Sequence, residues 1–215
     1  MAVFRAFKAL RPTEGKAAAV AALPYDVVNR EEAAAIGDQN PDSFLHVDRA
    51  EMDLPENTDL YDPKVYDKAR ENLADMERNG VMVQDETPCY YIYELTRKGR
   101  TQTGLVGCCS IDDYLNNVVK KHELTRSDKE LDRINHVDVC DANTGPIYLA
   151  CRYTDALSAL LEQWKKEHKA AYDFTEEDEI THRVWVIDGD EAISQIQDEM
   201  EKIPALYIAD GHHRA

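Results

Sequence analysis

Long hydrophobic runs are missing from this 215-residue sequence, and so is any excess of basic charge. No apolar stretch approaches the length of a membrane-spanning helix, and the N-terminal residues Met1 to Leu10 lack the apolar core of a signal peptide. Lys and Arg number 25 against 42 Asp and Glu, a formal net charge of -17. Because such a charge repels polyanions and anionic surfaces, we expect neither nucleic acid nor a membrane as a partner. A small anionic ligand remains compatible where basic groups and a divalent cation gather locally.

Cysteine is scarce, and its spacing does not pair it. The five cysteines are an odd number, and no two of them form a C-x-x-C motif, so neither a disulfide framework nor a zinc knuckle is indicated. Most of them lie in apolar stretches, where a free cysteine behaves as a small hydrophobic residue. Because unpaired cysteines suit a reducing compartment, we expect a cytoplasmic protein.

The patterning predicts an α+β fold in which a mixed sheet is flanked by helices. Hydrophobic residues make up 43% of the sequence, enough for a core, and we expect a single domain over residues 1–215. Two β-branched and aromatic runs over 87–96 and 101–111, joined by residues 97–100, predict a hairpin. Apolar residues at helical spacing predict helices over 30–36, 63–78, 156–168 and 191–202, and a capping-box spacing opens another at Ser127. Strands are expected at 3–10, 44–47, 147–151, 180–187 and 205–209, and a short strand or a linker at 17–23.

The most informative stretch is the last one, where an apolar strand over 205–209 runs into the polar segment Asp210 to Arg214. Gly211 allows a sharp turn or a close approach of the backbone to a ligand. A helix that begins at His212 would direct free N–H groups at an anion, and Arg214 adds a forked donor. The segment therefore predicts an anion site, and the alternatives are a structural turn with exposed histidines or a flexible tail. The sequence stops where this helix should begin, so we expect it to be the N-terminal part of a longer chain.

A second cluster of polar residues spans 120–126, with Arg133 beyond it. Lys121, His122, Glu123 and Thr125 place basic groups, a His–Glu pair and a hydroxyl group in one loop of an acidic protein. Local positive charge is what a phosphate site requires. The alternative is a solvated loop that leads into a helix.

Two further groups of residues are weaker candidates. Asp26 lies in a rigid turn after Pro24, where a carboxylate can act as a general base or a metal ligand, or simply accept backbone N–H bonds. His46 stands near Arg49 and Glu51 at the end of an expected strand, and we favour a surface with ordinary ion pairs there.

Several motifs occur in an order that resembles one family. They are Phe7–Pro12, Pro24–Val28, Ser43–Val47, His122–Thr125, Asp132–Arg133, Asn143–Ile147 and Asp210–Arg214. In these motifs the sequence is similar to the bacterial and archaeal family catalogued as domain of unknown function 1015, and the resemblance covers nearly the whole chain. The segment Asp-Gly-His-His-Arg is its most specific part.

The resemblance implies a fold and an activity. The family is similar to the ParB/sulfiredoxin-like superfamily, in which a Gly-x-x-Arg segment after a strand holds nucleotide phosphates. It implies that Gly211, His212, His213 and Arg214 contact phosphate here. Free serine kinases share that superfamily, so the resemblance implies a nucleotide-dependent kinase for a small hydroxyl metabolite such as L-serine. Family members usually continue well past the Asp-Gly-His-His-Arg segment.

We therefore expect a protein that binds ATP or ADP with Mg²⁺ and transfers phosphate to a small hydroxyl compound. Asp26 or Glu123 is the candidate base, and His212 or His213 would orient a phosphate or take a proton. Asp210 is a candidate Mg²⁺ ligand. The alternative is a non-catalytic, ParB-like regulator that binds nucleotides or nucleic acid, and the net charge of -17 argues against nucleic acid.

Overall fold

The computed structural model describes residues 2–122, 124–176 and 179–215, and they group into two compact units. The first unit comprises Met1–Glu14, Gln84–His122 and Leu149–Ala209, and the second comprises Gly15–Val83, Glu123–Tyr148 and Asp210–Ala215. Each unit is therefore assembled from three separate stretches of the chain. The expectation of a single domain over residues 1–215 stays a prediction.

The chain has the predicted α+β composition, but its strands form several small sheets rather than one. The largest is a four-stranded antiparallel sheet of the first unit, in the order β5-β4-β10-β9. The hairpin is confirmed, and Lys98 and Gly99 take positive φ angles of 49° and 75° in its turn, as a two-residue hairpin loop requires. Its strands are β4 (Tyr90–Arg97), β5 (Arg100–Val106), β9 (Tyr172–Thr175) and β10 (Thr181–Ile187).

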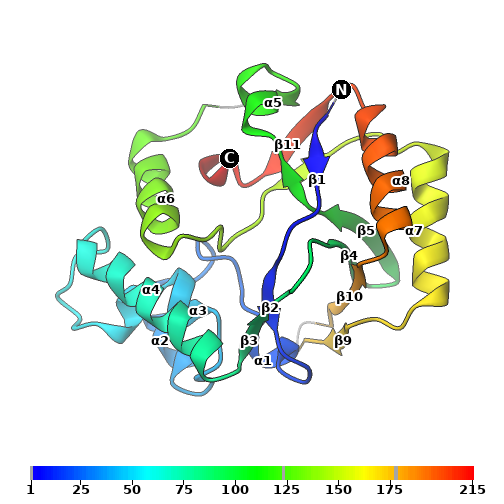
Figure 1. The fold of residues 1–215 in the computed structure, drawn as a ribbon. Helices are drawn as coiled ribbons and strands as arrows, with labels where there is room; N and C mark the ends of the chain where they lie inside the picture. The colour runs from blue at the N-terminus through cyan, green and yellow to red at the C-terminus, as the bar shows by residue number, and fades with distance from the viewer. Residues whose placement is uncertain (1, 123, 177–178) are drawn as a thin grey trace. The chain divides into compact units, whose positions relative to one another are not determined.

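Shorter strands and three helices complete the first unit (Figure 1). Strand β1 pairs with β6, and β11 lies between β7 and β8, parallel to β7. Helices α7 and α8 pack side by side. The bounds are β1 (Phe4–Arg5), β2 (Leu10–Pro12), β6 (Cys108–Cys109), α5 (Ile111–Leu115), β7 (Val119–Lys120), α7 (Asp155–Glu167) and α8 (Asp190–Glu201). Three strands include residues that are assigned to both units, namely β3 (Met82–Gln84), β8 (Tyr148–Ala150) and β11 (Leu206–Asp210).

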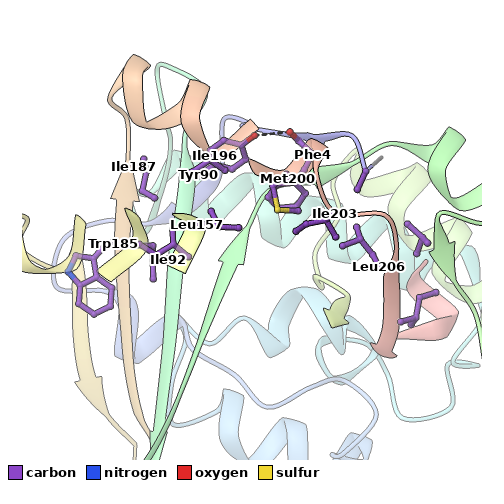
Figure 2. Close-up of a cluster of buried hydrophobic side chains, with 14 residues drawn as sticks. Phe4, Tyr90, Ile92, Leu157, Trp185, Ile187, Ile196, Met200, Ile203 and Leu206 are labelled. Carbon is purple, nitrogen blue, oxygen red and sulfur yellow. Dashed lines mark hydrogen bonds between the residues drawn. The ribbon is translucent and has the colours of Figure 1, made fainter. Parts of the chain in front are cut away.

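The core of the first unit lies between the sheets and helices α7 and α8. Figure 2 shows its labelled side chains, which come from β1, β4, β10, β11, α7, α8 and the segment leading into β11. The rings of Phe4 and Tyr90 stack with centroids 5.4 Å apart, and the Tyr90 hydroxyl donates to the Phe4 carbonyl at 2.8 Å. Each fully buried aliphatic side chain contributes roughly 1.5–3 kcal/mol, so this cluster stabilises the unit.

The second unit is built almost entirely from helices, in which α4 packs against both α3 and α6 (Figure 1). The predictions over 30–36 and 63–78 are confirmed. Asn29 forms a capping box with Glu32, and Asp62 caps a helix that has Pro63 in its first turn. The helices are α1 (Ala17–Val20), α2 (Arg30–Gly37), α3 (Leu45–Asp48), η1 (Ala50–Asp53), α4 (Pro63–Arg78), α6 (Ser127–Cys140) and η2 (His212–Arg214).

The strand prediction for 44–47 is wrong, and the segment 17–23, predicted as a short strand or a linker, begins with a helix. Residues Ala17–Val20 form the short helix α1, and Phe44 is the N-cap of α3, which contains residues 45–47. Runs this short show no period that separates a strand from a helix. The Ser43 hydroxyl accepts the N–H of Leu45 at 3.3 Å, and the Ser43 carbonyl accepts the N–H of His46 at 3.2 Å. These bonds form the first turn of a helix, which a serine favours at that place.

Helix α6 turns a polar face inward. Its side chains Asp132, His136 and Cys140 are buried, whereas Leu131 and Ile134 are 57% and 55% exposed. Its predicted capping box does not form, because the N-cap is Arg126 and Ser127 already lies inside the helix. Helix α6 therefore buries a stripe of polar side chains where a helix normally buries apolar ones.

A histidine joins three helices of the second unit. His46 of α3 donates through Nδ1 to the Asp53 carboxylate of η1 at 3.0 Å. Asn72 of α4 donates to Asp53 at 2.7 Å and to the carbonyl of His46 at 2.6 Å. The hydrogen bond to Asp53 raises the pKa of His46 above 6.5 in spite of burial. Burial raises the pKa of Asp53, but the hydrogen bond from His46 and the charge of His46 outweigh burial, so that the pKa of Asp53 is lowered.

This arrangement predicts a pH-dependent contribution to stability. The His46 contribution is complete below the unfolded-state pKa of about 6.5 and is lost as pH rises through the higher folded-state value. In urea denaturation, His46→Gln should therefore destabilise the protein most at about pH 5.5 and progressively less towards pH 9. A destabilisation that does not change over this range would show that the charge on His46 is irrelevant.

Candidate functional site

The terminal segment folds back on itself at Gly211. This residue has a φ of 85°, and a Cβ atom there would lie 2.9 Å from Nη2 of Arg214, so only glycine fits. Residues His212–Arg214 form one 3-10 turn, in which the N–H of Arg214 donates to the Gly211 carbonyl at 2.8 Å. Nη2 of Arg214 donates to Asp210 at 3.2 Å. The turn thus places Arg214 over the glycine and packs against α6.

Two arginines from distant parts of the sequence meet at one tyrosine ring. The guanidinium carbon of Arg133 lies 4.2 Å from the ring centroid of Tyr25, and that of Arg214 lies 5.9 Å from it. Both are within the range of a cation–π interaction. Burial raises the pKa of Tyr25, and the charge of Arg133 opposes the shift. Two cationic groups are therefore concentrated at a buried tyrosine of an acidic chain.

Carboxylates hold the two arginines in place. Asp132 accepts from Nε and Nη2 of Arg133 at 3.0 and 2.8 Å, and also from the Tyr66 hydroxyl at 3.0 Å. Asp210 binds Arg214, as described above. Because a paired guanidinium is restricted in orientation, its remaining N–H groups are aimed in fixed directions.

A third carboxylate, Asp48, lies within the electric field of both arginines. It accepts the Thr144 hydroxyl at 2.8 Å. Burial raises the pKa of Asp48, and the bond from Thr144 and the charges of Arg133 and Arg214 oppose that shift. Asp48 is the last residue of α3 and directly follows the segment 44–47 that was predicted as a strand. It is a largely buried carboxylate of the site.

A small cavity lies beside these groups. Its volume of about 40 Å³ accommodates about three or four water-sized groups, which is far too little for a nucleotide. Asp48, Asp132 and His136, together with Arg133 of the arginine pair, are among the polar residues of its lining. The full lining is Tyr25, Val47, Asp48, Arg49, Ala50, Glu51, Leu60, Tyr61, Val65, Tyr66, Lys129, Asp132, Arg133 and His136.

His136 is the most deeply buried polar group of the cavity, with 3% of its side chain exposed. Its Nε2 atom has no hydrogen-bond partner among the residues that the structure describes, and the closest acidic atom is Oδ1 of Asp48 at 3.9 Å. Burial and the charge of Arg133 together lower the pKa of His136 to about 4. The ring is therefore neutral at physiological pH.

The predicted residues divide between the two units. Arg133, His212, His213 and Arg214 lie in the second unit, where Nε2 of His213 accepts the N–H of Arg126 at 3.3 Å. Lys121 lies in the first unit, with its ammonium nitrogen 3.6 Å from the ring centroid of Tyr114.

The other predicted residues lie at or near the surface. His122 is exposed and belongs to the first unit. Thr125 donates to Glu130 at 2.7 Å, and Asp26 is exposed in the turn after the buried Tyr25. Glu123, the other candidate base, lies outside the described residues.

The predicted metal ligand has an ordinary interaction. Asp210 is 76% exposed in its side chain and is paired with Arg214. Within residues 2–122, 124–176 and 179–215, no group of three or more His, Cys, Asp or Glu side chains is arranged to hold a metal ion. One exposed carboxylate can still supplement the oxygens of a phosphate, as Mg²⁺ sites commonly require.

Sequence reasoning missed Asp48, Thr144 and His136. The signal for the last was present, because Asp132 and His136 stand four residues apart and so lie on one face of a helix. Asp48 follows the segment 44–47 that was incorrectly predicted as a strand, and Thr144 lies in the segment Asn143–Ile147, which was noted only for the family resemblance.

Removal of the ring face of Tyr25 tests the arginine pair. We expect Tyr25→Leu to lower the free energy of unfolding by about 1–2 kcal/mol more than Tyr25→Phe does, since only phenylalanine keeps the cation–π contacts. Urea denaturation of both variants measures this difference. Equal destabilisation by the two substitutions would contradict the interaction.

The neutrality of His136 is directly measurable. Its ring should titrate at about pH 4 by NMR, because burial and Arg133 disfavour the imidazolium. In Arg133→Gln the pKa should rise, since a positive neighbour is removed. Titration of His136 at an ordinary pKa of 6.5 in the wild type would contradict the buried environment.

Comparison with known proteins gives a family. No curated protein and no solved structure matches the chain. One family model matches residues 4–215, which include every residue of the site described above, and its description is "Protein of unknown function (DUF1015)". The chain therefore belongs to the DUF1015 family.

Proposed function

We propose that the second unit binds the phosphate groups of a nucleotide at Arg133 and Arg214, and that the protein transfers a phosphoryl group to a small hydroxyl metabolite such as free L-serine. The observation that carries the proposal is the pair of guanidinium groups at the ring of Tyr25. Arginine presents a planar fork of donors that matches phosphate oxygens. In a chain with a net charge of -17, two guanidinium groups at one ring favour the binding of an anion such as phosphate at that place.

An unpaired donor supports the same proposal. Nε of Arg214 is buried, and it has no hydrogen-bond partner in the part of the chain that the structure describes. A buried donor without an acceptor costs about 1–3 kcal/mol, and an anionic ligand would supply the acceptor. This donor lies beside Gly211 and Gly145, where a Cβ atom would approach within 3.2 and 3.5 Å of it.

The placement of the segment after β11 supports a ParB/sulfiredoxin-like core. Gly211 and Arg214 match the Gly-x-x-Arg pattern to which the resemblance assigns phosphate binding, and Gly211 makes the turn that the pattern needs. The segment contains no cysteine, so sulfiredoxin-type chemistry does not apply. The proposed nucleotide is ATP or ADP with Mg²⁺, for which Asp210 offers one carboxylate.

Catalysis of this kind rests on positioning and on neutralisation of charge. Arg133 and Arg214 would bind phosphate oxygens, and His213 or His212 would orient a phosphate or take a proton. The cavity of about 40 Å³ fits a small acceptor, so the nucleotide base must lie outside it. Asp26 and Glu123 remain the bases that the sequence proposes.

Calorimetric titration with MgADP and MgATP tests the phosphate site. We expect Arg214→Ala and Arg133→Ala each to weaken binding about 10- to 100-fold, because a hydrogen bond to a charged group contributes about 1.5–3 kcal/mol. Arg70→Ala is the matched control, since Arg70 is exposed and paired with Asp67 in the same unit.

Three outcomes separate the possibilities. Wild-type affinity in both arginine variants would remove the pair from nucleotide binding. Absence of nucleotide binding by the wild-type protein would refute the proposed function. Binding without phosphate transfer to L-serine or other small alcohols would favour the non-catalytic regulator.

A further inference from the structure

The cavity contains a polar pair that the predicted residue set leaves without a role. His136 is buried, the Asp48 side chain is 14% exposed, and Nε2 of His136 lies 3.9 Å from Oδ1 of Asp48. That separation is too long for a direct hydrogen bond. The pair faces a space of about 40 Å³ that lies beside Arg133. A buried polar atom that points into a cavity without a partner indicates a missing group.

We propose that Asp48 and His136 hold the reacting hydroxyl group of the acceptor, and that Asp48 takes the proton of that hydroxyl group. This inference rests on the proposed phosphoryl transfer and adds to it the location of the acceptor and the identity of the base. His136 acts here as a positioning residue.

The geometry suits a hydroxyl oxygen between the two side chains. Contacts of about 2.8 Å to each atom span their separation of 3.9 Å. The hydroxyl group donates to the Asp48 carboxylate and accepts from Nε2–H of the neutral His136 ring. A neutral imidazole can carry its proton on either nitrogen, and the carboxylate favours the tautomer that binds a bridging hydroxyl group.

Surrounding groups fix Asp48 for this role. The Thr144 hydroxyl donates to Oδ1 at 2.8 Å and so orients the carboxylate. Burial raises the pKa of Asp48, and a raised pKa strengthens a carboxylate as a general base. Arg133 and Arg214 act electrostatically on the Asp48 carboxylate. A hydroxyl group bound to Asp48 would therefore lie near the two arginines of the proposed phosphate site.

The transfer step balances without any further reagent. An oxygen lone pair of the acceptor hydroxyl forms a bond to the terminal phosphorus of the nucleotide. The bond from that phosphorus to its bridging oxygen breaks, and the electron pair stays on the departing nucleotide. The hydroxyl proton passes to the Asp48 carboxylate and then to solvent. No atom changes its oxidation state.

The volume of the cavity defines the class of acceptor. About three or four water-sized groups fit, which corresponds to a hydroxymethyl group and its nearest substituents. The cavity therefore admits the hydroxymethyl end of a small primary alcohol, and a whole sugar ring does not fit inside it. Asp26 is exposed and does not line this cavity, which makes Asp48 the better-placed base.

The first experiment needs no nucleotide. NMR of ¹⁵N-histidine-labelled full-length chain follows Nε2 of His136 during titration with L-serine, glycerol and ethylene glycol as probes. We expect at least one probe to shift this resonance in the wild type and in the control Asp67→Asn, and none to shift it in Asp48→Asn. Asp67 is an exposed carboxylate of the same unit, 61% accessible. An unmoved His136 resonance with every probe overturns the inference, whatever the nucleotide does.

The second experiment measures transfer from MgATP to the probe that binds best. Asp48→Asn keeps the shape of the side chain and its acceptor for Thr144, so we expect MgADP affinity within about twofold of the wild type and a kcat lower by about 100-fold or more. Thermal denaturation confirms folding of the variant. A wild-type kcat in Asp48→Asn excludes Asp48 as the base. A wild-type protein that shifts His136 but binds no nucleotide refutes the kinase proposal and leaves the hydroxyl site standing.

Discussion

The arrangement of the second unit depends on how Arg133 is held. Its guanidinium is fixed between the carboxylate of Asp132 and the ring of Tyr25. A buried charge is tolerated only with such partners, because desolvation otherwise costs several kcal/mol. Burial lowers the pKa of His136, and the charge of Arg133 acts in the same direction. Burial raises the pKa of Asp48, and the charge of Arg133 opposes that shift. One ion pair thus acts electrostatically on both groups beside the cavity.

Helix α6 reverses the usual relation between hydrophobicity and burial. Its inward face carries Asp132, His136 and Cys140, and Leu131 and Ile134 are exposed. The hydrophobic effect alone would select the opposite face. Polar groups are retained inside a protein at a cost in stability, so a stripe of them beside a cavity is better explained by chemistry than by packing. His46 needs no such chemical explanation, because its Nδ1 atom donates to Asp53 and its carbonyl accepts from Asn72.

Elements with strong local signals were predictable from the sequence. Helix α4 has Pro63 in its first turn and a sustained apolar period, and the hairpin has a two-residue turn that only one geometry satisfies. The short segment 44–47 was not predictable, because the bond from Leu45 to Ser43 decides its conformation. At the site, Arg133 and Arg214 were identified by residue type. Their meeting at Tyr25 could not be predicted, since it depends on three segments that are distant in sequence.

The discontinuous construction of the second unit has a consequence for biosynthesis. Residues 15–83 and 123–148 leave the ribosome well before Asp210–Ala215 does. Loops of this length close slowly, because long-range contacts form late. During translation, Tyr25 and Arg133 can associate while Arg214 is still unsynthesised, so the nascent unit passes through a stage with one guanidinium at the ring. Completion of the cationic pair is therefore tied to the synthesis of Asp210–Ala215, and a ribosome stalled before these residues would display the second unit without Arg214.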